Sequence, residues 1–389
     1  MICEHSKCTA CGSCIQICPV HCIEFKEYDG ERYPIINEDK CINCDLCKRH
    51  CPSLQKVNLN DIQNAYAAYA NADATRLSCA SGGAFTCLAE NILGQGGIVF
   101  GSSMNPDLSI EHICVARKED LNKIKGSKYV YSDGKDCYQL AKEALKRGRK
   151  VLYSGTPCQI AGLYSYLGKD YAELTTVDLV CHGTPPYKLF YEYIKDFEKE
   201  KKCSVLEYKF RSHMGHRGGY FGELTYKSKK TVTKPLLWNC DSYYCYFMYG
   251  VIYRENCYSC PYAQRKRVAD ITLGDFWGIE HIISGARAGN VSLVLINTEK
   301  GKALLNETQN MKIISVDVES AVRHNGQLNH PMEKPIELRN RFYNLYSNGG
   351  WRKVRLDFYS RNKKIRMASW VAFYTPDWIK KILHRIREK

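Results

Sequence analysis

The chain has 389 residues, which is enough for two or three domains, and its ordinary apolar content excludes a disordered protein. The formal net charge is +15, but no zinc-finger, RNA-binding or helix-turn-helix signature accompanies it, so we expect no nucleic-acid partner. The sequence starts without the features of a signal peptide, and no apolar run approaches the roughly 18 residues of a membrane span. We therefore expect a cytoplasmic protein, in which the 21 cysteines indicate metal binding rather than disulfides.

Two runs of cysteines near the start of the chain share one spacing. Residues 8–19 read CTACGSCIQICP and residues 41–52 read CINCDLCKRHCP. Both fit C-x2-C-x2-C-x3-C-P, the spacing of bacterial ferredoxins, in which three thiolates of a run bind one [4Fe-4S] cluster and the fourth binds the other cluster. We predict a first cluster on Cys8, Cys11, Cys14 and Cys51 and a second cluster on Cys41, Cys44, Cys47 and Cys18.

The competing interpretation of these runs is structural zinc, which uses two C-x2-C pairs rather than four cysteines in one run. Cys3 and Cys22 lie outside the pattern, and we expect them to be small buried side chains. Between the runs, IEFKEYDGERYPIIN at 23–37 predicts a β-hairpin. Residues 1–55 are therefore predicted to form a ferredoxin-type domain, and the polar segment 56–68 a linker.

Beyond the linker, predicted strands alternate with predicted helices. We expect helices at 83–93, 136–148, 157–167 and 187–200, and strands at 96–104, 149–153, 174–181, 204–211, 222–227 and 291–297. This order predicts a mixed α/β domain over 69–340, so the overall fold class is α+β. No G-x-G-x-x-G and no G-x-x-x-x-G-K-[ST] occurs, which argues against a nicotinamide site of the Rossmann type and against a P-loop.

Five segments of the large domain, taken together and in order, form a recognisable set of motifs. They are SGGAFT (81–86), GSKYVYS (126–132), GTPCQIAGL (155–163), DLVCHGTP (178–185) and CYSCPYAQRKRVADITLGDFWG (257–278). They resemble the family of coenzyme F420 hydrogenase/dehydrogenase beta subunits, which includes 7-hydroxymethyl chlorophyll a reductase. The resemblance covers the chain to about residue 300. It implies FAD in the large domain, a further [4Fe-4S] cluster beside it, and electron transfer between the two.

A third cluster needs four more ligands. Cys257 and Cys260 form a C-x2-C pair, and Cys158 and Cys181 each follow a predicted buried strand within a motif of the family. Cys158 also opens a predicted helix, where a thiolate is favoured; the alternative is that it is a low-pKa or merely buried thiol. Since some family members replace one cysteine with aspartate, the substitutes to consider are Asp178, Asp270 and Asp275.

The resemblance also implies a flavin site by motif position. The pyrophosphate would face Ser81, Gly82 and Gly83, the ribityl–phosphate region Lys128 or Ser132, and the isoalloxazine edge Thr156 and Gln159. His182 is the candidate proton donor, because an imidazole titrates near neutral pH. The alternative is a structural histidine that fixes the end of a strand.

The expected function is that of an iron–sulfur flavoprotein oxidoreductase. Electrons would pass from a ferredoxin or another low-potential donor through the clusters to FAD and on to a small organic substrate. The segment 257–278 resembles bacterial relatives found among surface-polysaccharide genes, which makes a polysaccharide-precursor sugar a candidate substrate. The alternative is an electron-relay or coenzyme F420-oxidising subunit of a larger redox complex.

The end of the chain, 341–389, is predicted to be a basic helical tail. Residues 351–389 hold twelve Lys and Arg against three acidic residues, and WIKKILHRIREK at 378–389 predicts an amphipathic helix with a cationic face. Such a helix can lie on an anionic membrane surface, at the inner face of the membrane, or dock on its own domain.

Overall fold

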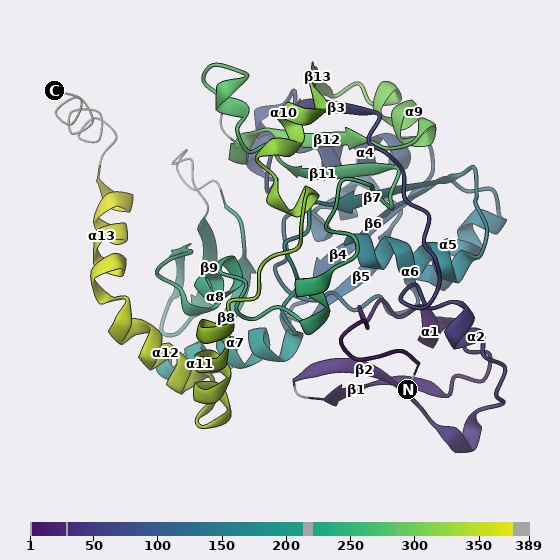
Figure 1. The fold of residues 1–389 in the computed structure, drawn as a ribbon. Helices are drawn as coiled ribbons and strands as arrows, with labels where there is room; N and C mark the ends of the chain where they lie inside the picture. The colour runs from purple at the N-terminus through teal and green to yellow at the C-terminus, as the bar shows by residue number, and fades with distance from the viewer. Residues whose placement is uncertain (1, 29, 213–220, 287, 376–389) are drawn as a thin grey trace.

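The computed structural model describes residues 2–28, 30–212, 221–286 and 288–375. It confirms the α+β class: a small N-terminal domain packs against a larger mixed domain, which is built on one long sheet and one short sheet (Figure 1). Among the described residues, no helix is long and apolar enough to cross a membrane.

The small domain consists of a hairpin and two one-turn helices. β1 (Ile23–Tyr28) pairs antiparallel with β2 (Glu31–Ile36), as the alternating sequence predicted. α1 (Ser13–Gln16) and α2 (Leu46–Arg49) each carry the third cysteine of one run. Gly12, just before α1, has a φ of 84°, a left-handed conformation that favours glycine.

The large sheet has eight strands in the order β13-β3-β12-β11-β7-β6-β4-β5. β4, β6, β7 and β11 are parallel neighbours, and β3 runs in the same direction because it pairs antiparallel with the reversed strand β12. The carboxyl ends of these strands therefore share one edge, where ligands collect in such sheets. The strand bounds are β3 (Asn64–Ala70), β4 (Ile98–Met104), β5 (Ile110–Val115), β6 (Val151–Ser154), β7 (Leu174–Leu179), β11 (Ile271–Asp275), β12 (Ser292–Ile296) and β13 (Met311–Val316).

Helices cover both faces of this sheet. α4 (Ala84–Gly94) and α9 (Glu299–Glu307) bury their apolar side chains against one face, and α5 (Cys137–Lys146) and α6 (Pro157–Leu167) against the other. Alternate residues of β4 and β6 enter the two cores, as expected of strands buried on both sides. Two shorter helices flank the sheet, α3 (Asp73–Leu77) and α10 (Val318–Arg323).

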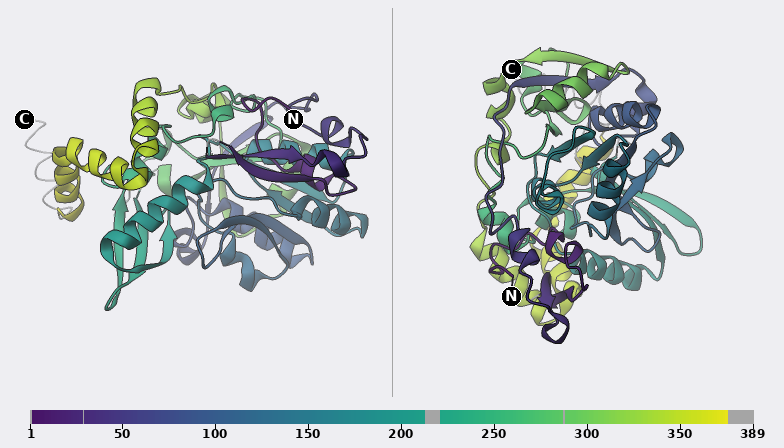
Figure 2. Two further views of the ribbon diagram at one scale, coloured as in Figure 1. Left: turned by 90° about the horizontal axis from the view of Figure 1, so that it is seen from below. Right: turned by 90° about the vertical axis from the view of Figure 1, so that its right-hand side faces the viewer.

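A further core lies beside the long sheet. The antiparallel strands β8 (Ser204–Lys209), β9 (Phe221–Lys227) and β10 (Thr231–Leu237) pack with helices around a cluster rich in tyrosine and phenylalanine. The helices are α7 (Tyr187–Lys201), α8 (Ser242–Met248), α11 (Ile336–Ser347) and α12 (Gly350–Arg361). α13 (Lys363–Tyr374) follows and projects on the side of the molecule away from the small domain (Figures 1 and 2).

Two expected boundaries differ from the structure. β3 starts at Asn64, inside the expected linker 56–68, because its alanines pair with β12 and β13. The tail expected from residue 341 starts inside α11, and α12 buries Trp351, Val354 and Phe358 in the aromatic core. Apolar burial therefore makes α12 part of the domain. The amphipathic helix expected at 378–389 lies outside the described residues.

Candidate iron–sulfur and cofactor site

The two cysteine runs form two cavities in the small domain. The first is lined by the predicted first set, Cys8, Cys11, Cys14 and Cys51, and the second by the predicted second set, Cys18, Cys41, Cys44 and Cys47. The fourth cysteine of each run thus crosses to the other site, as the ferredoxin spacing predicted. The sites differ in depth: Cys8, Cys14 and Cys51 are buried, whereas Cys41, Cys44 and Cys47 are half-buried.

Each cavity contains a fifth thiol that the spacing did not place there. Cys3 lines the first cavity, and its hydrogen bond is the main cause that lowers the pKa of Cys51 to about 6. Cys22 lines the second, with its sulfur 3.5 Å from that of Cys18. The sequence signal for Cys22 is its position four residues after a predicted ligand. Cys3 is brought in only by the tertiary fold.

The donors around the two cavities are thiols, which are the ligands of iron–sulfur clusters. Within the part of the chain that the structure describes, no group of three or more His, Cys, Asp or Glu side chains is placed to hold a metal ion. A [4Fe-4S] cube instead bonds each thiolate through a different iron atom, so its ligands surround a cavity. Four thiols around each of two cavities have this arrangement.

The third predicted set also comes together, at the carboxyl edge of the large sheet. Cys158 starts α6, Cys181 follows β7, and Cys257 and Cys260 lie in and after the 3-10 turn Glu255–Ser259. After burial, the main causes that raise the pKa of Cys181 are the neighbouring thiols Cys257, Cys158 and Cys260. The fold therefore brings one C-x2-C pair and two single cysteines within electrostatic reach of each other.

The thiol of Cys158 does not have a low pKa. Burial raises its pKa to about 11, with Cys260 as the next cause, although the side chain starts a helix and lies 3.2 Å from the Thr156 hydroxyl. Loss of hydration thus outweighs the helix dipole at this thiol, and the helix terminus alone does not favour its thiolate.

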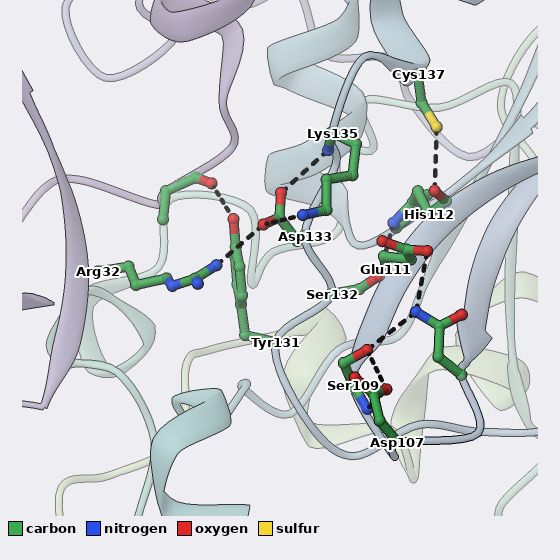
Figure 3. Close-up of polar contacts among 12 residues, drawn as sticks. Arg32, Asp107, Ser109, Glu111, His112, Tyr131, Ser132, Asp133, Lys135 and Cys137 are labelled. Carbon is green, nitrogen blue, oxygen red and sulfur yellow. Dashed lines mark hydrogen bonds and ion pairs between the residues drawn. The ribbon is translucent and has the colours of Figure 1, made fainter. Parts of the chain in front are cut away.

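The first and third sets are neighbours across the domain boundary. A Cβ atom built on Gly162 of α6 would lie 2.8 Å from the Cβ of Cys11 and 2.9 Å from its sulfur, so glycine permits this approach. The Tyr138 hydroxyl lies within hydrogen-bond distance of the carbonyls of Cys11 and Gln159, at 2.9 and 2.8 Å. In Figure 3, Tyr131 donates to a carbonyl of the small domain, that of Ala10, at 2.7 Å.

The three aspartates considered as substitute ligands have other partners. Asp178 forms a fully buried ion pair with Arg267 at 3.1 Å. Asp270 accepts hydrogen bonds from Thr176 and Thr298, and Asp275 pairs with Arg211 at 2.8 Å. These carboxylates brace the strands around the site, and four cysteines are available without them.

The residues predicted for the isoalloxazine edge hold a network together. Thr156 and Gln159 form the capping box of α6, and the Gln159 side chain also donates to the Ser132 carbonyl at 2.9 Å. The Ser132 hydroxyl lies 2.8 Å from Nδ1 of His112 (Figure 3), and Nε2 of His112 lies 3.1 Å from the Ser154 carbonyl. Burial lowers the pKa of His112 to about 4, so this ring is neutral near pH 7.

Lys128 lies beside this network, and no carboxylate among the described residues forms an ion pair with its amine. Its ammonium donates to the Lys125 carbonyl at 2.7 Å. Burial lowers its pKa to about 7. A half-buried amine without a carboxylate partner among the described residues is suited to receive an anionic group.

The residues predicted for the pyrophosphate lie at another point of the same edge. Gly82 packs against the strands, since a Cβ there would lie 2.4 Å from the Ala68 carbonyl and 2.6 Å from the Ser292 nitrogen. Gly83 caps α4 with a φ of 91°, and the Ser81 hydroxyl donates to the Val291 carbonyl at 3.2 Å. Three strand spacings, roughly 14 Å, separate β12 from β6. A single ligand in contact with both groups would therefore have to be at least as long as this separation.

His182 lies between these two groups, directly after Cys181. Burial lowers the pKa of its imidazole, and the nearby carboxylate of Asp275 opposes that change. The histidine is therefore biased towards its neutral form. The sequence analysis did not single out His112, Tyr138 or the buried Arg254, since none of them stands in a recognised spacing pattern.

Comparison with known proteins agrees with the two-part organisation. Residues 148–321 match the family described as the C terminus of the coenzyme F420 hydrogenase/dehydrogenase beta subunit, and residues 7–54 match the 4Fe-4S dicluster domain. The small domain is 44% identical over 39 residues to Ferredoxin-1 of Caulobacter vibrioides, covering 10% of this chain and 31% of that protein.

Two other relatives match a larger part of the chain than the ferredoxin does. An uncharacterized protein of Methanocaldococcus jannaschii is 26% identical over 200 residues, which cover 43% of this chain and 54% of the relative. One of the subunits of the F(420)H(2) dehydrogenase of Methanosarcina mazei is 24% identical over 166 residues, which cover 40% of this chain and 47% of the relative. The chain thus spans about half the length of these relatives.

A solved structure, described as a xenon derivative of the F420-reducing [NiFe] hydrogenase complex from Methanosarcina barkeri, aligns over 75% of this chain and 94% of that one. Its TM-score is 0.42 and its identity 16%. Residues 7–54 thus resemble a 4Fe-4S dicluster domain, in agreement with the two cysteine cavities, and residues 148–321 resemble the C-terminal domain of coenzyme F420 hydrogenase/dehydrogenase beta subunits.

Proposed function

We propose that the protein is an iron–sulfur flavoenzyme that carries electrons through three clusters to FAD and reduces a small organic substrate. The observation that supports it most is the order of the cysteine sets in space. Three of the four cysteines of the second set are half-buried, whereas three of the four of the first set are buried. The first set contacts α6, whose first turn carries Cys158 of the third set. This order leads from the protein surface to the carboxyl edge of the sheet.

The residues at that edge have distinct proposed roles. Lys128 would hold an anionic part of the flavin, and the turn at Ser81 to Gly83 would receive the pyrophosphate. The capping box of α6 and the neutral His112 would keep the turn after β6 rigid. FAD, when bound, supplies the exchange between one-electron and two-electron chemistry. His182 would hold a proton beside the flavin or the substrate.

The proposed donor is a ferredoxin or another low-potential protein that docks near the second set, whose cysteines are the more exposed ones. A polysaccharide-precursor sugar remains the proposed substrate class. The second candidate function is that of a relay or F420-oxidising subunit of a larger complex. It is favoured by the name of one relative, which is part of a dehydrogenase.

The proposal is tested by measuring iron, acid-labile sulfide and flavin in anaerobically purified protein. About twelve iron atoms and one FAD per chain are expected from three cubes. About eight irons with FAD would remove the third cluster and leave the flavoprotein in place. Eight irons without flavin would contradict the flavoenzyme. Co-purification of an obligate partner protein would favour the relay function.

A further inference from the structure

Arg254 is a fully buried cation at the boundary between the two domains. It follows the apolar segment 251–253 of the large domain and is 1% exposed. Its Nη2 atom reaches into the small domain, where it lies 3.3 Å from the Cys8 carbonyl and 3.3 Å from the Arg32 carbonyl. An arginine buried this deeply is rare unless it is paired.

The partner of Arg254 is Glu31, at the start of β2. The ion-pair distance is 3.3 Å, and the Glu31 side chain is itself buried. The carboxylate also accepts hydrogen bonds from the Tyr33 hydroxyl and from the Glu255 backbone amide, both at 3.0 Å. The rings of Tyr33 and Tyr131 lie 5.3 and 5.8 Å from the guanidinium carbon. The cation therefore sits in an enclosure that is low in water.

Arg254 also forms backbone hydrogen bonds with the segments that carry the third cysteine set. Its backbone amide donates to the Thr184 carbonyl at 3.1 Å, three residues after Cys181, and its carbonyl accepts from the Cys257 amide at 3.0 Å. The guanidinium of Arg254 thus contacts the backbone of the first set, and its main chain contacts the backbone beside the third set. One buried cation therefore lies next to both sets.

We propose that Arg254 is a positioning residue that raises the reduction potentials of the first and third clusters, and that the carboxylate of Glu31 partly offsets this effect. This inference rests on the proposed function, since it requires both clusters. Reduction adds one electron to a cluster, so a buried cation close by stabilises the reduced form and raises the potential. The buried Glu31 carboxylate acts in the opposite sense. Charges act strongly here because little water screens them.

The chain offers a matched control. Arg32 also pairs across the domain boundary, with Asp133 at 2.9 Å (Figure 3). Its side chain is, however, 47% exposed. Solvent screens this pair, so its removal should leave the cluster potentials unchanged. A role of Arg254 in holding the domains together, without any electrostatic role, would change unfolding but not the potentials.

The test is a potentiometric titration of the purified holoprotein, monitored by electron paramagnetic resonance. Arg254→Gln should lower the reduced-to-oxidised ratio of the first and third clusters about tenfold at a fixed potential, which is 59 mV for one electron. Glu31→Gln should shift the same clusters upward by a similar amount, and the double variant should fall between. The cluster potentials of Arg254→Lys and Arg32→Gln should stay close to those of the wild-type protein. The potential of the second cluster should stay unchanged in every variant.

The inference would be overturned if the potentials of both single variants shifted in the same direction. It would also be overturned if the reduced-to-oxidised ratios stayed within twofold of wild type in variants that retain their iron. If Arg254→Gln does not fold, Glu31→Gln alone still decides: an upward shift supports the proposal and an unchanged potential contradicts it. A wild-type protein with eight irons would instead contradict the third cluster, and with it the three-cluster form of the proposed function. The two failures are therefore distinguishable.

Discussion

Cys158 and Cys203 are both half-buried cysteines of the large domain, but their surroundings differ. Cys158 lies among Cys181, Cys257 and Cys260, whereas the charges that act on Cys203 are Glu198, Lys234 and Lys201. Only the first environment supplies further soft ligands. Whether a cysteine can act as a cluster ligand therefore depends on the thiols around it rather than on its own exposure.

Replacing Cys158 with alanine should therefore remove the proposed third cluster. We expect a loss of about four iron atoms per chain, because a cube that lacks one of its four thiolates is no longer held. The measurement is iron and sulfide per chain after anaerobic purification. The matched variant Cys203→Ala should keep the full iron content. Equal iron in both variants would mean that Cys158 is not a ligand.

If the proposed function holds, Lys128 should make flavin binding dependent on pH. The pKa of its amine is about 7 in the folded protein, against 10.5 in an exposed lysine. An anionic phosphate binds the protonated amine, so affinity for FAD should be constant below pH 7 and should fall above it by up to about tenfold per pH unit. The fluorescence of added FAD measures this affinity.

The Lys128→Met variant should bind FAD weakly and without this pH dependence. Lys123→Met, which alters an exposed lysine paired with Asp120, should behave like the wild-type protein. An unchanged pH profile in Lys128→Met would place the phosphates elsewhere.

At the scale of elements, the contact between the cysteine run of the small domain and α6 fixes how the two domains meet. Gly162 lies within α6, and its missing side chain provides the room for Cys11 and for the Tyr138 hydroxyl. A glycine inside a helix costs about 1 kcal/mol relative to alanine, so the close approach offsets an unfavourable helix residue.

Gly162→Ala should therefore lower the free energy of unfolding by about 1–3 kcal/mol, despite the better helix propensity of alanine. The methyl group would overlap Cys11, and the domains would separate or shift. Urea unfolding followed by circular dichroism measures the change. Gly94→Ala in α4, where a Cβ meets only the end of Lys118 at 3.7 Å, should be neutral or stabilising. A stabilised Gly162→Ala protein would contradict the contact.

α13 has one packed face and one exposed apolar face. Trp370 and Phe373 pack against Phe221, Leu237 and Cys240, so part of the helix docks on its own domain. The exposed face carries apolar side chains that are each more than half exposed, beside Lys363 and Lys364: Ile365, Met367, Val371 and Tyr374. Apolar residues beside lysines are typical of helices that lie on anionic membrane surfaces.

We expect the full chain to sediment with vesicles that contain an anionic lipid such as phosphatidylglycerol, and not with vesicles of phosphatidylcholine alone. Val371→Asp should reduce this binding several-fold, because it places a charge in the exposed apolar face. Leu140→Asp, at an exposed apolar position of α5, serves as the control and should bind normally. Equal binding of both variants would exclude α13 as the contact.

At the scale of the whole molecule, the cysteine sets and the polar residues form one continuous arrangement. The small domain supplies two sets, the large sheet supplies the third at its carboxyl edge, and Tyr131, Tyr138 and Arg254 connect the domains by hydrogen bonds. An arrangement of this kind requires the two domains to be docked as one body rather than joined only by the segment after Pro52.

The sequence by itself determined the parts of the protein that depend on local spacing. The ferredoxin runs, the hairpin, and α6 with its Thr-Pro start could be predicted because spacing, turn residues and caps act over a few positions. The tertiary structure decided what depends on distant residues meeting. It brought Cys3 to Cys51, paired Glu31 with Arg254, placed α12 in the aromatic core and raised the pKa of Cys158 by burial. Burial and charge pairing are properties of the packed chain, so no local pattern encodes them.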